Sequence, residues 1–164
     1  MKTQFFILIA FIIFIGCQNQ TTNETPVATT EQSAPPPINP FDTLPLLPRP
    51  AVEEIFNQLD VVSINFLNGL SPITVYGDQQ SKNLYTALLT GLKPTNPICT
   101  NPFATFSFSG KGKALAQGSI FFQQGCTYLI FQDINTNQYT YICQMGNKGI
   151  NTLNQIIQGQ TQKQ

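Results

Sequence analysis

The second half of the chain consists of four short runs typical of β-strands, separated by turn residues, and this pattern constrains the fold more than any other feature. The runs cover residues 103–109, 113–123, 128–132 and 138–144. The joints between them are short and contain Gly, Asn and Asp, as in Gly110-Lys111-Gly112. Such joints connect neighbouring antiparallel strands, so the pattern predicts a four-strand meander.

An earlier pair of runs predicts a β-hairpin. Val62, Ile64 and Phe66 alternate with polar residues, an Asn-Gly pair at 68–69 offers a turn, and residues 73–76 are β-branched or aromatic. A rival interpretation continues the preceding helix through Val62 and Phe66, because their spacing also fits a helical period. We favour strands, since a helix here would carry poor helix formers and apolar residues on all sides.

Helical spacing of apolar residues recurs in three segments around these strands. The predicted helices are residues 50–59, a second that is capped by Asp78 or Ser81 and stops before Gly91, and a third that is capped by Asn147 and ends at Gly159. Strands and helices together predict an α+β domain. Its single antiparallel sheet combines the hairpin with the meander, and about three helices pack mainly on one face.

The first 16 residues have the pattern of an export signal. Lys2 gives a positive start, and residues 5–15 are an unbroken apolar run of 11 residues. A helix of that length measures about 16 Å, well short of the roughly 30 Å hydrocarbon core of a membrane. We therefore expect a signal peptide and not a stable membrane span.

Gly16 stands directly before Cys17, and polar residues begin at Gln18. This arrangement resembles the lipobox of bacterial lipoproteins, with Phe14 where Leu is typical. The resemblance implies cleavage after Gly16, a diacylglycerol on the Cys17 thiol and an acylated new amino terminus. Stable anchoring takes more than one acyl chain, a condition that a lipidated Cys17 meets. Gln18 in place of Asp favours the outer membrane under the enteric sorting rule, so we expect an extracytoplasmic, lipid-anchored protein.

The segment between the signal and the domain predicts a disordered tether. Seven of the 12 prolines lie between residues 18 and 49, and apolar residues are sparse there. A flexible coil of this length spans roughly 30 Å. The predicted organisation is a signal peptide at 1–16, a lipidated tether at 17–49, a globular domain at 50–160 and a tail at 161–164.

Composition argues against several classes of function. Histidine is absent, which removes the commonest general base and metal ligand. Eight acidic residues balance eight basic ones, without any block of five like charges, so capture of nucleic acid by charge is unsupported. Asp60, Asp78 and Asp133 form no catalytic spacing. We predict no enzyme, no catalytic residue, no metal site and no cofactor.

Three cysteines fall within the predicted domain. Cys99, Cys126 and Cys143 are expected at one end of the sheet, because successive strands of a meander reverse direction. An extracytoplasmic location permits a disulfide, and three pairings are possible, each of which leaves one thiol. We favour a bridge that includes Cys126, with Cys99 as its partner ahead of Cys143.

Two features suggest binding surfaces. Tyr139 and Tyr141 occupy alternate positions of the last predicted strand, which would place both on one face, with Tyr128 beside them. Tyrosines are enriched in recognition surfaces, although a half-buried aromatic face has the same pattern. The strand at 114–118 carries small side chains on one face, which either admit a helix closely or leave a hollow for a ligand.

We therefore expect a membrane-tethered, non-enzymatic binding module that interacts with a protein partner in the cell envelope. The alternative is a small-ligand or glycan binder that uses the face with Tyr139 and Tyr141. An enzyme of unknown class is the least favoured possibility.

Overall fold

The computed structural model describes residues 40–95, 97 and 99–162. The predicted signal peptide, the lipobox residues Gly16 and Cys17, and the tether as far as residue 39 lie outside these described residues. Pro36–Gln164 forms one compact unit, which we call the domain fragment. Every buried polar side-chain atom in the described part of this unit has a hydrogen-bond partner, as buried polar groups of folded proteins generally do.

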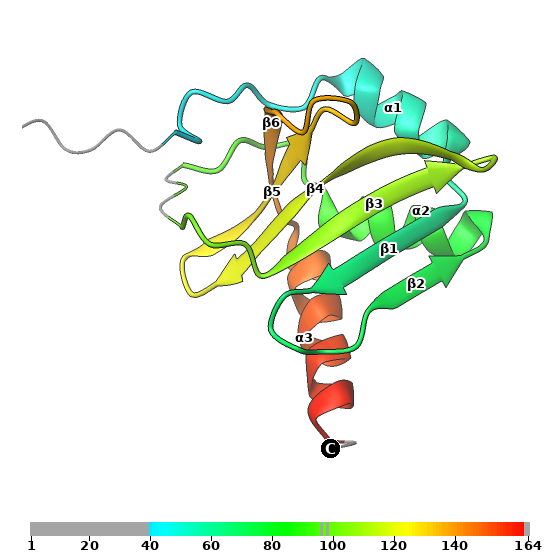
Figure 1. The fold of residues 1–164 in the computed structure, drawn as a ribbon, viewed down its shortest axis with the longest axis vertical. Helices are drawn as coiled ribbons and strands as arrows, with labels where there is room; N and C mark the ends of the chain where they lie inside the picture. The colour runs from blue at the N-terminus through cyan, green and yellow to red at the C-terminus, as the bar shows by residue number, and fades with distance from the viewer. Residues whose placement is uncertain (1–39, 96, 98, 163–164) are drawn as a thin grey trace, which may run out of the picture. The chain divides into compact units, whose positions relative to one another are not determined.

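Six strands form one antiparallel sheet in the order β2-β1-β3-β4-β5-β6 (Figure 1). The strands are β1 Val61–Phe66, β2 Ile73–Tyr76, β3 Ala104–Gly110, β4 Lys113–Gln123, β5 Cys126–Gln132 and β6 Tyr139–Gln144. Strand β1 pairs with both β2 and β3, so the hairpin and the meander join in a single sheet, as predicted. Lys111 and Gly112, with φ of 50° and 73°, make the tight turn between β3 and β4.

The three helices are α1 Arg49–Gln58, α2 Asp78–Leu88 and α3 Asn147–Thr161. They share one hydrophobic core with the sheet, to which they contribute Ile55, Leu88 and Leu153. In Figure 1, α2 is seen behind β1 and β3. The predicted α+β architecture, with helices on one face, is confirmed.

The N-cap residues of α2 and α3 differ from the predicted ones. Gly77 and Gly146 occupy the N-cap positions of α2 and α3, and neither helix has a side-chain cap. Asp78 lies in the first turn of α2, where a negative charge complements the helix dipole. Ser81 is fully buried, and its hydroxyl donates to the carbonyls of Asp60 and Val75. Ser81 therefore fastens α2 to the β1–β2 hairpin instead of capping the helix.

The ordered domain begins before the predicted boundary at residue 50. Phe41 and Leu47 are each only 5% exposed. Leu46 forms a parallel bridge with Ile142, and the Ile142 N–H donates to the carbonyl of Pro45 at 2.9 Å. The predicted tether at 17–49 is therefore too long, because apolar side chains among its prolines cover the sheet at β6.

Candidate binding surfaces

The face of the sheet away from the helices is divided into an apolar half and a polar half. The apolar half is covered by Phe41 and consists of Phe121, Cys126, Tyr128, Ile130 and Ile142. The polar half begins at β2 and extends to Gln132 at the end of β5. Within the six strands, the single charged residue is Lys113. The groups that this half of the sheet offers are therefore hydrogen-bonding groups rather than charges.

The polar half is organised in register rows that cross the strands. We call its side chains the polar ladder: Thr74, Ser63, Ser107, Gln117 and Gln132 in one row, and Asn65, Thr105 and Ser119 in the next. Neighbouring strands lie about 4.8 Å apart, so the first row is about 19 Å long. The ladder therefore places hydroxyl and amide groups at regular intervals across five strands, and Ser119 among them is buried, at 5% exposed.

Much of the hydrogen-bonding capacity of the polar ladder is unused. The hydroxyls of Ser63 and Thr74 are 3.3 Å apart. Within the described chain, the side chains of Asn65, Thr105 and Ser107 have no hydrogen-bond partner in the protein. These groups remain available to a ligand, since hydroxyls and amides both donate and accept.

An exposed tyrosine lies toward each end of this face. Tyr76 on β2 is 72% exposed and pairs with Val61 in the row beside Thr74. Tyr139 on β6 is 45% exposed and pairs with Gln132. Sequence reasoning missed Tyr76, although the alternation of residues 73–76 places it on the same face as Thr74.

The structure does not bring the three predicted tyrosines together. Tyr128 is 1% exposed, and its hydroxyl donates to the Cys99 carbonyl at 2.5 Å. Burial raises the pKa of Tyr128 to about 12. Tyr139 contacts Phe41 on the open side, whereas Tyr141 packs against the core on the helix side. Tyr128 and Tyr139 both lie on the open side, but Tyr128 is buried there and Tyr141 lies on the helix side, so the three tyrosines do not form one exposed surface.

A bulge separates Tyr139 from Tyr141. Phe131 pairs with Tyr141, but the next residue, Gln132, pairs with Tyr139. Thr140 is thus an additional residue in β6, and its hydroxyl donates to the Phe131 carbonyl at 3.3 Å. Because an extra residue reverses the alternation of side chains, the two tyrosines point to opposite faces.

Cys99 and Cys126 form a disulfide, with Cα atoms 6.1 Å apart. It ties the irregular segment before β3 to the start of β5. Cys143 is a free, buried thiol whose pKa is raised by burial. It pairs with Leu129, three residues beyond Cys126, and therefore lies on the opposite face of the sheet from the disulfide. A buried thiol of this kind is unreactive.

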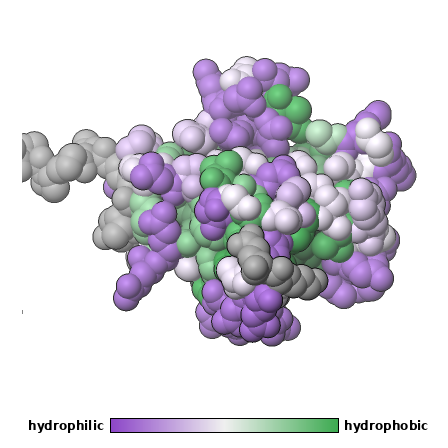
Figure 2. All heavy atoms as spheres, turned by 60° about the horizontal axis from the view of Figure 1, so that its bottom comes forward, coloured by the Kyte–Doolittle hydropathy of each residue, from purple (hydrophilic) through white to green (hydrophobic). Residues whose placement is uncertain are grey.

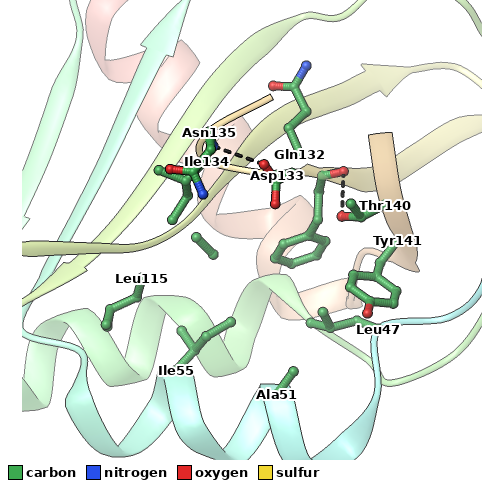
Figure 3. A pocket seen from close by; sticks show the side chains of 12 residues that line it. Leu47, Ala51, Ile55, Leu115, Gln132, Asp133, Ile134, Asn135, Thr140 and Tyr141 are labelled. Atoms are coloured by element: carbon green, nitrogen blue, oxygen red, sulfur yellow. Dashed lines mark hydrogen bonds between the residues drawn. The ribbon is translucent and has the colours of Figure 1, made fainter. Parts of the chain in front are cut away.

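A cleft of about 320 Å³ lies on the other face of the sheet, between α1 and strands β4–β6 (Figure 3). One wall is the side of α1 with Ala51 and Ile55, and the loop after β5 and Tyr141 lie opposite. The small side chain of Ala116 lines the hollow, while α1 packs on the same part of the sheet. The small residues at 114–118 thus admit a helix and also leave a space beside it.

A second hollow, of about 520 Å³, lies between α1 and α2. Phe56 lines it and is 39% exposed, with the Lys82 ammonium 5.2 Å from the centre of its ring. The Tyr85 hydroxyl, also at this hollow, already donates to the Val52 carbonyl at 3.1 Å. Glu53, the residue with a formal charge among those that line this hollow, forms an ion pair with Arg49 at 2.9 Å.

Figure 2 shows the side of the domain that faces down in Figure 1. Apolar residues there are interrupted by hydrophilic and weakly polar ones, and hydrophilic residues surround them. A large continuous apolar patch, which is typical of protein interfaces, is not seen from this side.

The described residues contain no group of three or more Cys, Asp or Glu placed to hold a metal ion. Among the helices described, none is both long and apolar enough to cross a membrane. Comparisons with protein-family models, with curated proteins and with solved structures found no match to this chain.

Proposed function

We propose that the chain is a non-enzymatic binding module of the bacterial cell envelope, anchored through lipids on Cys17, whose open sheet face binds an uncharged, hydroxyl-rich polysaccharide. The observation that carries this proposal is the polar ladder. It places hydroxyl and amide groups in register across five strands, with no charged residue among them, and the side chains of Asn65, Thr105 and Ser107 have no partner within the described chain.

The chemistry of the ladder matches that of a neutral glycan. Sugar hydroxyls donate and accept hydrogen bonds, as do Ser, Thr, Asn and Gln side chains. The exposed rings of Tyr76 and Tyr139 offer apolar faces on which the C–H groups of a sugar ring can lie. A charged ligand would lose hydration on this face without meeting an opposite charge. The polar ladder therefore favours neutral ligands.

A protein partner, which the sequence favoured, fits this face less well. Protein interfaces have a buried centre enriched in aromatic residues and Arg, inside a polar rim. The centre of this face is Ser63, Ser107 and Gln117, and its tyrosines lie toward the two edges of the sheet. The arrangement thus supports the glycan alternative.

Affinity electrophoresis of the domain fragment tests the proposal. We expect a gel that contains a neutral glucan, mannan or chitin-derived polymer to retard the protein, and anionic alginate to leave it unaffected. Thr74→Glu places a charge at the end of the ladder and should abolish retardation. The matched control, Thr86→Glu, makes the same change on an exposed position of α2 and should not.

Equal retardation of Thr74→Glu and Thr86→Glu would contradict the proposal. So would a wild-type protein that none of the neutral polymers retards. A cross-linked envelope protein that is captured by the wild type but not by Thr74→Glu would assign the same face to a protein partner instead.

The anchor is tested separately by the intact mass of the full chain purified from bacterial membranes. We expect a mature chain that begins at Cys17 and carries the added mass of a diacylglycerol and an acyl group. Cys17→Ser should remain unprocessed and unlipidated. A wild-type chain without added lipid mass would refute the anchor and leave the glycan proposal to its own test.

A further inference from the structure

Asp133 uses only one of its two carboxylate oxygens to shape the loop between β5 and β6. Its Oδ1 accepts hydrogen bonds from the N–H of Asn135 at 2.9 Å and from the N–H and hydroxyl of Thr136 at 2.8 and 3.0 Å. Within the described chain, Oδ2 accepts no hydrogen bond and Asp133 has no ion pair. In Figure 3 this second oxygen is on the side that faces α1 across the cleft.

The carboxylate at this position is charged at neutral pH. Hydrogen bonds from Thr136, followed by that from Asn135, lower the pKa of the Asp133 carboxyl. Among the residues that line the cleft, Asp133 alone carries a formal charge. The cleft therefore has one negatively charged group, the Asp133 carboxylate, which lies in the loop at its edge.

The remainder of the cleft is suited to an apolar group. Ala51 and Ile55 from α1 form one side, and the buried Phe131 ring also lines the cleft. The partly exposed Tyr141 ring lies beside Leu47, and its hydroxyl has no partner within the described chain (Figure 3). A volume of about 320 Å³ is within the range of small-molecule sites.

We propose that this cleft binds an organic ammonium ion, with its charged nitrogen at Asp133 and its apolar body between α1 and Tyr141. An ammonium group supplies the donors that Oδ2 lacks, and the aromatic walls favour a cation over an anion. An anionic ligand is repelled by Asp133. A neutral apolar ligand gains nothing from the free carboxylate oxygen. Except for Gln132, which lines the cleft and also ends a row of the polar ladder, the two sites consist of different residues, and the cleft does not depend on glycan binding.

The test is a titration of the isotopically labelled domain fragment with phenethylammonium, followed by NMR of the Asn135 and Thr136 amide signals. Phenethyl alcohol, which has the same shape without the charge, is the matched probe. We expect saturable shifts with the ammonium and binding at least about fivefold weaker with the alcohol. N-acetyl-lysine methylamide tests whether the ammonium group comes from a peptide lysine or from a free amine.

Asp133→Asn keeps a side-chain carbonyl for the loop and removes the charge, so it should weaken ammonium binding by about fivefold or more. Asp42→Asn, on an exposed residue outside the cleft, should bind like the wild type. Ala116→Leu fills the hollow and should abolish binding without touching the loop. Equal affinity for the ammonium and the alcohol would overturn the proposal. So would unchanged binding by Asp133→Asn or Ala116→Leu, or the absence of binding by both the phenethylammonium and the lysine probe.

Discussion

The ring of Phe41 meets the ring of Tyr139 edge-on, with centroids 5.4 Å apart and planes at 90°. The same Phe41 ring contacts Phe121 at 5.4 Å, so one side chain from the start of the domain bridges β4 and β6. This contact covers the apolar half of the open face and leaves the polar ladder uncovered. The residues just before α1 therefore decide which part of the sheet a ligand can reach.

Phe41→Ala should lower the free energy of unfolding of the domain fragment by about 3 kcal/mol, because it removes a buried aromatic side chain from the smaller core. Urea unfolding measures the effect. Leu67→Ala is the control, since Leu67 is 59% exposed and its loss should change stability by less than about 0.5 kcal/mol. If the two variants unfold alike, Phe41 does not hold residues 40–47 on the sheet.

Reduction of the Cys99–Cys126 disulfide should lower the free energy of unfolding by about 3 kcal/mol, because the bridge closes a loop with a sequence separation of 27. Urea unfolding with and without reductant measures this change. Cys99→Ser combined with Cys126→Ser should reproduce the reduced protein. Equal midpoints in the two conditions would show that the bridge does not constrain the chain.

Cys143 should react with a thiol reagent only when the domain unfolds, since it is 1% exposed and burial raises its pKa. A colorimetric thiol assay of the non-reduced domain fragment should detect no fast-reacting thiol in buffer and one in denaturant. Cys143→Ser should remove the thiol that the wild type shows in denaturant. Rapid labelling of the folded wild type would contradict the buried position of Cys143.

Alkaline pH should destabilise the fold through its buried tyrosines. Burial raises the pKa of Tyr128 from 10 to about 12 and also raises that of Tyr85. The folded state thus holds these protons more tightly than the unfolded state. For Tyr128, the resulting stabilisation is complete below pH 10 and is lost as the pH rises through about 12. The near-ultraviolet absorbance of tyrosinate should show a component near pH 12 that is missing in Tyr128→Phe. If the component near pH 12 persists in Tyr128→Phe, it does not come from Tyr128.

Most of the fold was predictable because local patterns agree with it. The alternation around Val62 and Ile64 and the short turn at 110–112 determine strands whose neighbours are adjacent in sequence, and antiparallel pairing follows. The same topology placed Cys99, Cys126 and Cys143 at one end of the sheet, where the favoured pair, Cys99 with Cys126, was expected. The structure confirms each of these predictions.

The candidate sites were less predictable, because they depend on single residues that break local rules. Thr140 adds one residue to β6 and so separates Tyr139 from Tyr141, which a strict period of two cannot indicate. Phe41 lies among prolines and looks like part of a linker, yet it has an apolar partner far along the chain. The polar ladder appears only when the register between strands is known, because its members come from five separate segments.

The most direct test of the central claim is NMR of the labelled domain fragment during titration with neutral oligosaccharides from glucan, mannan and chitin. The side-chain amide signals of Asn65, Gln117 and Gln132, which lie on the polar ladder, should shift and saturate with at least one of them. Those of Asn151 and Asn154 on α3 should not move. Shifts confined to residues off the ladder, or no shift with any neutral oligosaccharide, would contradict the proposal that the open sheet face binds a glycan.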